Sequence, residues 1–364
     1  MRVLVTGSAG FIGGAVARAL QAAGHEVVGI DAMIAQAHPA GVRPPHGTRA
    51  VDVRDPAALD PVLAGVDVVC HQAAMVGNGV DAQDLPAYAS HNDVGTAVLL
   101  AAMARTGAAR LVLASSMVVY GDGLYRCGRH GVTRPAPRRD ADLRASRFDP
   151  RCAHCADVVT WTSVPEDAAF DPRSSYAASK VAQEHYTSAW CTLQSGRAVA
   201  LRYHNVYGPG MPRDTPYAGV AAIFRSALSA GAAPQVFEDG RQTRDFVHVD
   251  DVAAANVAAV EAVADHPAGL TPYNICSGHP FTIGEMASVV AEACGGPAPQ
   301  VTGDYRPADV RHVVADPQAA VRGLGFAAAV APQPGLREFA TAPLRDTGTA
   351  VAAETGKPLL GRAD

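Results

Sequence analysis

Two side chains capable of acid–base chemistry stand four residues apart in the segment YAASK, from Tyr176 to Lys180. On a helix, residues at this spacing share one face, so the phenol and the ammonium would be neighbours. A free tyrosine, with a pKa of about 10, is a poor base at neutral pH, and a nearby cation favours its phenolate. The pair therefore predicts proton transfer to or from a hydroxyl. An ordinary surface pair on a helix is the alternative, although Lys180 is one of only two lysines in 364 residues.

A glycine-rich turn follows the first apolar run, with Gly7, Gly10 and Gly13 in a G-x-x-G-x-x-G pattern. Such a turn brings the backbone and a helix N-terminus close to a pyrophosphate. Asp31 ends the second apolar run, where a carboxylate accepts hydrogen bonds from both ribose hydroxyls and repels a 2′-phosphate. The pattern predicts an NAD site and disfavours NADP, although a glycine turn alone also simply joins a strand to a helix.

Two serines, Ser115 and Ser116, follow another apolar run, at the edge of the sheet where a cofactor would lie. A serine hydroxyl there can hydrogen-bond the reacting oxygen, and an oxidised nicotinamide nearby would further favour a phenolate. The predicted catalytic residues are Tyr176, Lys180 and one of these two serines.

Between the serine and the tyrosine stand CGRH at 127–130 and CAHC at 152–155. Seven cysteines without a signal-peptide pattern argue against a disulfide framework. Three thiolates and an imidazole suffice for a closed, structural zinc site, and a chance cluster is the alternative. His154 is an alternative fourth ligand. The predicted metal ligands are Cys127, His130, Cys152 and Cys155.

Apolar runs and helical patterns alternate along the chain. Strands are expected at 2–6, 25–30, 66–71, 110–115, 198–203 and 244–248, and helices at 11–23, 175–195 and 217–230. Strands that alternate with helices predict a parallel sheet with right-handed crossovers. Residues 122–170 break this rhythm, being rich in Arg, Pro, Gly, Cys and His.

The composition excludes several classes of protein. Hydrophobic residues make up 48% and charged residues 18%, as in a globular chain with a sizeable core. A net charge of −5 without a basic block argues against nucleic acid as a partner. No apolar run is long enough to cross a membrane, so a cytoplasmic protein is expected.

Together, the motifs resemble the extended short-chain dehydrogenase/reductases, in particular the NAD-dependent nucleotide-sugar epimerases and dehydratases, over residues 1–316. The longest matches are TGSAGFIG at 6–13, SSMVVYG at 115–121, RYHNVYGP at 202–209 and GRQTRDFVHVDD at 240–251. Shorter ones are DVRD at 52–55, HQAA at 71–74, Asn92 with the Gly-Thr pair at 95–96, and RPAD at 306–309.

The resemblance implies an α/β, Rossmann-type doubly wound parallel sheet with a smaller C-terminal substrate-binding domain. The expected NAD-binding domain is 1–205, with 122–170 as an insertion and 245–275 returning to it. Residues 206–244 and 276–340 would bind the nucleotide sugar, and 341–364 would form a C-terminal tail. A homodimer through helices near 92–105 and 176–195 is also implied.

The same resemblance implies tightly bound NAD, a nucleotide-diphosphate sugar as substrate, and Ser116 of the SSMVVYG segment as the catalytic serine. Cofactor contacts are implied for Gly7, Gly10, Phe11, Ile12, Gly13, Asp31, Asp52, Val53, Ala73, Ala74, Asn92 and Lys180. Substrate contacts are implied for Met75, Met117, His204, Asn205, Arg244, Arg306 and Asp309. For His204, a packed histidine without a ligand contact is the alternative.

Two positions depart from the family members that dehydrate sugars. Those enzymes carry an Asp-Glu pair directly after the catalytic hydroxyl residue, where this chain has Met117 and Val118. Neither side chain transfers protons, so epimerisation at C4 through a 4-keto sugar is predicted. With Met75 they predict an apolar wall suited to a 6-deoxy sugar.

The insertion resembles that of bacterial dTDP-L-rhamnose 4-epimerases, which favours a dTDP-6-deoxyhexose such as dTDP-L-rhamnose as substrate. Two alternatives within enzymes stay open: an NAD(P)H-dependent reductase of nucleotide 4-keto sugars, and a UDP-hexose or UDP-uronate 4-epimerase. A nucleotide sensor without catalysis is disfavoured, because Ser116, Tyr176 and Lys180 are all present.

Overall fold

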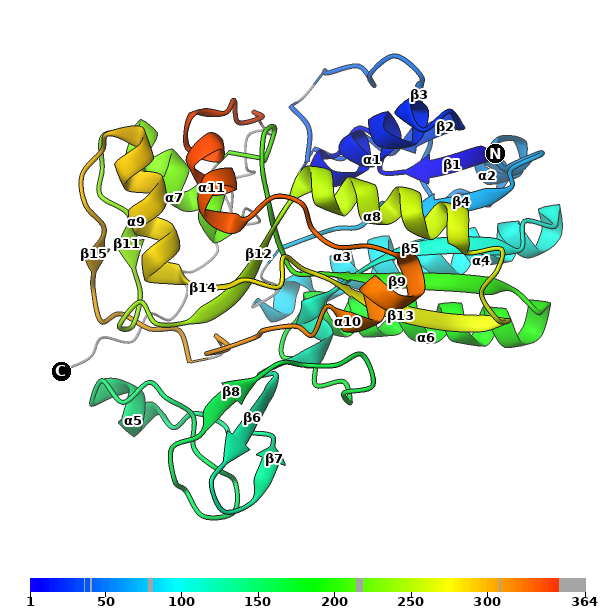
Figure 1. The fold of residues 1–364 in the computed structure, drawn as a ribbon. Helices are drawn as coiled ribbons and strands as arrows, with labels where there is room; N and C mark the ends of the chain where they lie inside the picture. The colour runs from blue at the N-terminus through cyan, green and yellow to red at the C-terminus, as the bar shows by residue number, and fades with distance from the viewer. Residues whose placement is uncertain (36, 40, 78–80, 214–218, 308, 347–364) are drawn as a thin grey trace.

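The computed structural model describes residues 1–35, 37–39, 41–77, 81–213, 219–307 and 309–346. Its main unit is a seven-stranded sheet in the order β13-β9-β5-β4-β1-β2-β3, with every neighbouring pair parallel (Figure 1). The strand order reverses between β1 and β4, as in a Rossmann sheet. The strands are β1 (Arg2–Thr6), β2 (Glu26–Asp31), β3 (Thr48–Ala50), β4 (Val68–His71), β5 (Arg110–Ser116), β9 (Arg197–Tyr203) and β13 (Gly269–Ile275).

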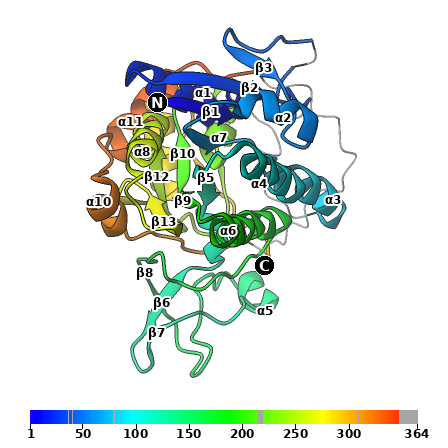
Figure 2. The same cartoon turned by 90° about the vertical axis from the view of Figure 1, so that its right-hand side faces the viewer.

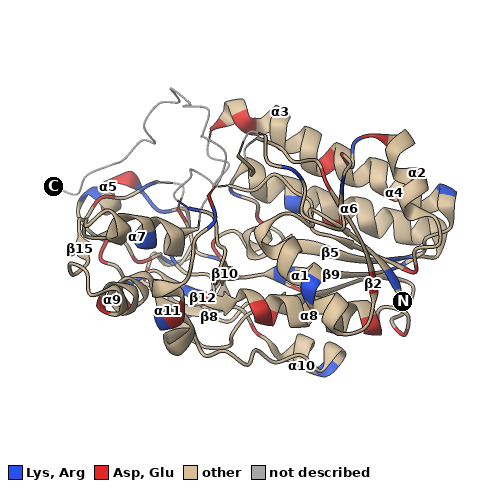
Figure 3. Cartoon of the chain, turned by 90° about the horizontal axis from the view of Figure 1, so that it is seen from above, with Lys and Arg blue, Asp and Glu red and all other residues tan. Residues whose placement is uncertain are grey.

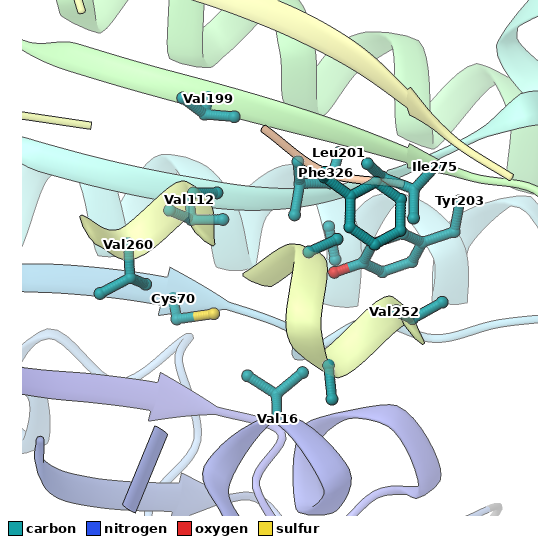
Figure 4. Packing of buried hydrophobic residues seen from close by; sticks show 14 of the residues in the cluster. Val16, Cys70, Val112, Val199, Leu201, Tyr203, Val252, Val260, Ile275 and Phe326 are labelled. Atoms are coloured by element: carbon teal, nitrogen blue, oxygen red, sulfur yellow. The ribbon is translucent and has the colours of Figure 1, made fainter. Parts of the chain in front are cut away.

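Helices cover both faces of this sheet (Figure 2). One face carries α1 (Phe11–Ala22) and α8 (Val249–Ala262), and the other carries α2 (Pro56–Leu63), α4 (Gly95–Thr106) and α6 (Ser175–Gln194). Val16 of α1 and Val252 of α8 pack in one cluster with sheet residues such as Val112 and Val199 (Figure 4). Because both faces are buried, the strands are almost continuously apolar, which is why their positions could be predicted.

A smaller unit packs α7 (Val220–Ser229), α9 (Ile283–Cys294) and α11 (Pro332–Thr341) around a second core that includes Phe224 and Phe339. Its strands are β10 (Asn205–Tyr207), β12 (Thr243–His248) and β14 (Pro280–Thr282), and the pair β11 (Gln235–Val236) and β15 (Gln300–Val301). One helix in the 276–340 range lies elsewhere, because Ala320 of α10 (Gln318–Leu324) packs into the core of the Rossmann unit.

The insertion folds as a separate three-stranded antiparallel sheet, at the bottom of Figure 1. It comprises β6 (Leu124–Cys127), β7 (Gly131–Thr133), α5 (Asp140–Arg144) and β8 (Thr160–Thr162). Its strands were not predicted, because three- and four-residue strands show too little apolar alternation.

Short helical turns complete the chain. They are η1 (Ala82–Asp84), α3 (Leu85–Tyr88), the π-helical turn η2 (Ala89–Val94) and η3 (Met117–Tyr120). The helix expected at 217–230 is α7; Tyr217, Ala308 of the RPAD segment and the tail beyond 346 lie outside the described residues. Acidic and basic side chains are interspersed over the fold (Figure 3). None of the described helices has the length and apolarity needed to span a bilayer.

Candidate active site

A cavity of about 390 Å³ opens at the carboxyl edge of the sheet and is walled partly by the glycine loop. Gly7 has φ +69°, and a Cβ there would lie 2.8 Å from the Ala73 nitrogen. A Cβ on Gly13 would lie 2.1 Å from the Gly7 oxygen. Both positions thus require glycine, and the loop fits a pyrophosphate at the N-terminus of α1. The predicted cofactor residues that line this cavity are Gly7, Gly10, Phe11, Ile12, Gly13, Asp31, Asp52, Val53, Ala73 and Ala74.

Asp31 presents an anionic carboxylate at the end of β2. It accepts hydrogen bonds from the backbone N–H groups of Ala9 (3.1 Å) and Met33 (2.8 Å), and His38 Nε2 lies 3.3 Å from Oδ1. Burial raises the pKa of Asp31, but His38 and the two amides outweigh burial and hold it below its usual value. The carboxylate therefore suits ribose hydroxyls and opposes a 2′-phosphate. His38 was missed by the sequence analysis, since nothing in its loop signals proximity to Asp31.

Asn92, for which a cofactor contact was expected, uses its side chain for hydrogen bonds to Met75 and Ser179. Fully buried in η2, it accepts from the Met75 N–H (2.7 Å), donates to the Met75 carbonyl (2.9 Å) and donates to the Ser179 hydroxyl (2.8 Å). These bonds hold Met75, which lines the cavity, in a fixed position relative to α6.

The three predicted catalytic side chains come together beside the cavity. Ser116 ends β5 and lines the cavity, and its hydroxyl hydrogen-bonds Tyr176 of α6. The Lys180 ammonium donates to the Ala114 carbonyl at 2.8 Å and lies 5.8 Å from the centre of the Tyr176 ring. This grouping can deliver or remove a proton at an oxygen that is also held by Ser116.

Burial shifts the pKa values of this group in the protein alone. Lys180 together with an oxidised nicotinamide was expected to lower the pKa of Tyr176; in the protein alone, burial raises that pKa to about 12, and the Ser116 hydroxyl offsets only part of the rise. Burial also lowers the pKa of Lys180 to about 7, against the opposing effect of Glu184. A buried site disfavours both charged forms, so the phenolate needs a further positive charge close by.

A buried ion pair, not predicted, fixes α6 against the sheet. The Ser115 hydroxyl donates to Glu184 at 2.5 Å, and Glu184 pairs with Arg202 at 2.7 Å with both side chains 3% exposed. The two neighbouring serines thus do different work: Ser115 anchors α6, whereas Ser116 lines the cavity.

The predicted sugar contacts form two groups. Met75, Met117, His204 and Asn205 line the cavity. Asn205 Oδ1 is buried without a hydrogen-bond partner among the described residues. The His204 ring is buried and has a side-chain hydrogen bond with Asn274, so a packed histidine stays an alternative to a ligand contact.

The second group lies in the smaller unit. Arg244 donates to the carbonyls of Val310 and Arg311, and burial lowers its pKa while Asp309 opposes this. Arg306 lies over the Phe237 ring at 5.0 Å and 3.9 Å from Asp309. These cationic side chains suit a diphosphate.

The four predicted metal ligands converge, with their ligand atoms all within 4.8 Å of one another. Cys127 Sγ lies 3.6 Å from Cys155 Sγ, and His130 Nδ1 lies 3.5 Å from the sulfurs of Cys127 and Cys152. Tetrahedral zinc with its usual bond lengths gives edges of about 3.8 Å between sulfurs and about 3.5 Å between sulfur and nitrogen.

The two turns of this cluster hydrogen-bond their sulfurs in the same way. The amide N–H two residues after Cys127 donates to that sulfur at 3.4 Å, and the N–H two residues after Cys152 does likewise at 3.4 Å. Such donors favour thiolates. His154, the alternative ligand, lies beside the His130 ring but outside the convergent set.

The insertion contacts the smaller unit through buried charges. Arg138 pairs with Glu238 at 2.6 Å, and the fully buried Arg311 pairs with Glu238 at 2.8 Å and with Asp149 of the insertion at 3.0 Å. Glu238 has φ +54°, a backbone conformation unusual for a side chain with a Cβ. Two arginines thus fix a strained, buried carboxylate close to the Arg244 and Asp309 group.

The fold and the site define a Rossmann enzyme of the short-chain dehydrogenase/reductase type. Residues 3–140 and 157–276 match the NAD dependent epimerase/dehydratase family, and the chain belongs to that family. The expected family, the Rossmann fold and the expectation of an epimerase-type enzyme with NAD are thereby confirmed. The gap between the two matched ranges, 141–156, includes Cys152 and Cys155 of the insertion.

The relatives include several epimerases. The chain is 34% identical to a dTDP-L-rhamnose 4-epimerase of Burkholderia thailandensis over 93% of this chain and 94% of that protein. It is 33% identical to a UDP-glucose 4-epimerase of Mycolicibacterium smegmatis over 92% and 96%. Among solved structures, the UDP-glucose 4-epimerase of Thermus thermophilus in complex with NAD is 29% identical, with a TM-score of 0.72 over 93% of this chain and 98% of that one.

Proposed function

We propose that this enzyme is a nucleotide-sugar 4-epimerase that retains its NAD through turnover and acts in the cytoplasm on a dTDP-6-deoxyhexose such as dTDP-L-rhamnose. The observation that carries the proposal is the convergence of Ser116, Tyr176 and Lys180 beside a cavity walled by the glycine loop. The relative from Burkholderia thailandensis supports the choice of sugar.

In the proposed reaction, the Tyr176 oxygen takes the proton of the sugar C4 hydroxyl while the C4–H bond breaks, which leaves a 4-keto sugar. Bound NAD supplies the hydride acceptor, then the hydride donor, and a positive charge that favours the phenolate. The Ser116 hydroxyl donates to the same sugar oxygen, and Lys180 stabilises the phenolate. After the sugar turns, C4 regains hydride on its other face and the oxygen regains the proton from Tyr176, so the net change is inversion at C4.

The substrate site follows from the side chains around the cavity. Met75 and Met117 supply an apolar wall for a 6-deoxy carbon, and neither supports the proton transfers of a dehydration. We assign His204 and Asn205, which line the cavity, to the sugar. We assign the diphosphate and nucleotide ribose to Arg244, Arg306 and Asp309.

We further propose that Cys127, His130, Cys152 and Cys155 bind a structural zinc ion. The near-tetrahedral edges and the paired amide-to-sulfur hydrogen bonds support this site. With four protein ligands and no open position, it would crosslink the insertion and take no part in chemistry.

A homodimer through α4 and α6 is also proposed. Leu193 and Tyr186 of α6 are 79% and 46% exposed, and Val94, just before α4, is 50% exposed. Sedimentation of the purified enzyme, with Leu193→Lys as the disrupting variant, tests this assembly; a monomeric wild type would refute it.

The function is tested by incubating the enzyme with dTDP-L-rhamnose, without added cofactor, and following the products by NMR. The proposal predicts the C4 epimer, dTDP-6-deoxy-L-talose, and the same final mixture from either sugar. Turnover only of a 4-keto sugar with added NADH would indicate a reductase. Turnover of UDP-sugars alone would reassign the nucleotide.

A further inference from the structure

Arg345 brings a positive charge to the cofactor cavity from a segment that carries no recognised motif. The segment after α11 lies alongside the turn that follows β10. The Arg345 N–H donates to the Met211 carbonyl at 3.0 Å, and the Arg213 N–H donates to the Arg345 carbonyl at 2.9 Å. Because these bonds are made by the backbone, they fix the segment independently of the Arg345 side chain.

The Arg345 side chain reaches the glycine loop. Its Nη1 donates to the Ala9 carbonyl at 2.6 Å, and the Ala9 N–H donates to Asp31 at 3.1 Å. Ala9 lies between Gly7 and Gly10, so the guanidinium stands beside the loop whose amides face a pyrophosphate. Among the described residues that line the cavity, Arg345 is the one lysine or arginine.

No ion pair within 4.0 Å is formed by Arg345 in the described part of the chain, although the Asp31 carboxylate lies near enough to act on its charge. Its side chain bonds a backbone carbonyl, and its Nε is buried without a partner among those residues. Burial lowers the pKa of Arg345 and Asp31 opposes this, yet a guanidinium stays charged at neutral pH. The cavity wall also carries the Asp31 carboxylate, which repels a pyrophosphate unless a cation offsets it, whereas Asp52 is already paired with Arg54 at 2.6 Å.

We infer that Arg345 is a cofactor-binding residue that holds the pyrophosphate of NAD against the glycine loop and slows release of the cofactor. Its planar fork of donors matches phosphate oxygens, which a lysine cannot reproduce. The inference uses the NAD dependence of the family and is independent of which sugar the enzyme converts.

The test is calorimetric titration of NAD-stripped Arg345→Gln. Loss of a charge-assisted contact to phosphate predicts about 10- to 100-fold weaker binding of NAD and of ADP-ribose, with adenosine binding unchanged. NAD should also leave this variant faster on gel filtration. Arg345→Lys should fall between the variant and the wild type. Arg213→Gln is the matched control, because Arg213 lies on the adjoining segment with a half-exposed side chain paired to Asp346, and it should bind as wild type.

NAD affinity within twofold of wild type in both Arg345 variants would overturn the inference. So would a loss confined to NADP, which would place the guanidinium at the 2′-phosphate, or an equal loss for adenosine, which would indicate a loosened site. A wild type that binds NAD through Arg345 but epimerises no sugar would refute the proposed function alone. An active Arg345→Gln with normal NAD affinity would refute this role alone.

Discussion

The Rossmann unit and the insertion at 122–170 are stabilised in different ways. The sheet of the Rossmann unit is buried between helices by many apolar side chains, such as Val3, Val112 and Leu201, each worth roughly 1.5–3 kcal/mol when fully buried. The main apolar cluster of the insertion holds Tyr125 and Val159 together with two of the candidate metal ligands. Stability is therefore spread over many residues in the Rossmann unit, whereas we propose that in the insertion it depends on metal binding by the four-ligand cluster.

The two regions also differ in the roles of their residues: one carries the proposed catalytic side chains, and the other contacts the residues assigned to the substrate. The Rossmann unit supplies Ser116, Tyr176, Lys180 and the glycine loop. The insertion reaches the smaller unit through Arg138 and Asp149, beside the residues assigned to the diphosphate. Changes in the first region should abolish turnover without loss of fold, whereas changes in the second should alter stability and substrate binding.

The largest effect is expected from Tyr176→Phe, which removes the proton acceptor and donor. We expect turnover to fall by about 10²- to 10⁴-fold, because general acid–base catalysis contributes that range. NAD affinity should be unchanged, since Tyr176 touches the reacting oxygen and the glycine loop is intact. Tyr186→Phe is the control, because it removes a phenol hydroxyl from the same helix at the proposed dimer surface, away from the cavity, and keeps the aromatic ring. Full activity of Tyr176→Phe would refute its catalytic role.

His130→Ala should release the metal and loosen the insertion, since a structural zinc site supplies folding energy directly. We expect zinc content, measured by plasma mass spectrometry, to fall from one ion per chain to none, with a lower thermal midpoint and near-normal NAD affinity. His154→Ala is the matched control, because that ring lies beside the cluster without joining it. Wild-type protein without bound metal would contradict the site.

Arg138→Met removes one of two arginines from Glu238, a carboxylate 3% exposed. Breaking a buried ion pair typically costs about 3–5 kcal/mol, and the remaining partner Arg311 should reduce this. We expect lower stability and a raised KM for the nucleotide sugar, with kcat and NAD affinity little changed. Arg129→Met, at an exposed pair with Asp157, should be nearly neutral. An equal KM in the two variants would show that this contact of the insertion does not affect substrate binding.

The smallest effect concerns pH. Because the folded pKa of Lys180 is lowered to about 7, below its unfolded value, the unfolded state binds more protons above pH 7. Burial of Lys180 thus destabilises the NAD-free protein most below pH 7, and stability is regained as pH rises from 7. In denaturant titrations from pH 7 to 8.5, wild type should gain up to about 1.4 kcal/mol per pH unit relative to Lys180→Met. Parallel pH curves for the two proteins would contradict this.

The sequence predicted what depends on local pattern. Apolar runs located strands such as Arg2–Thr6, and the spacing of CGRH and CAHC located a four-ligand cluster. The sequence did not predict contacts between residues that are far apart in the chain. Arg345 meets Ala9 across 336 positions, and Arg138 meets Glu238 across 100. The burial that raises the pKa of Tyr176 in the protein alone was missed for the same reason, since burial is invisible in a spacing of four residues.

The most direct test uses dTDP-L-rhamnose carrying deuterium at C4, in ordinary water and without added cofactor. In the proposed reaction the hydrogen removed from C4 would return to the same carbon without exchange with solvent, so we expect the C4 epimer with its deuterium retained. Loss of the label to solvent, or product only after addition of NADH, would contradict a self-contained epimerase that works by transient oxidation at C4.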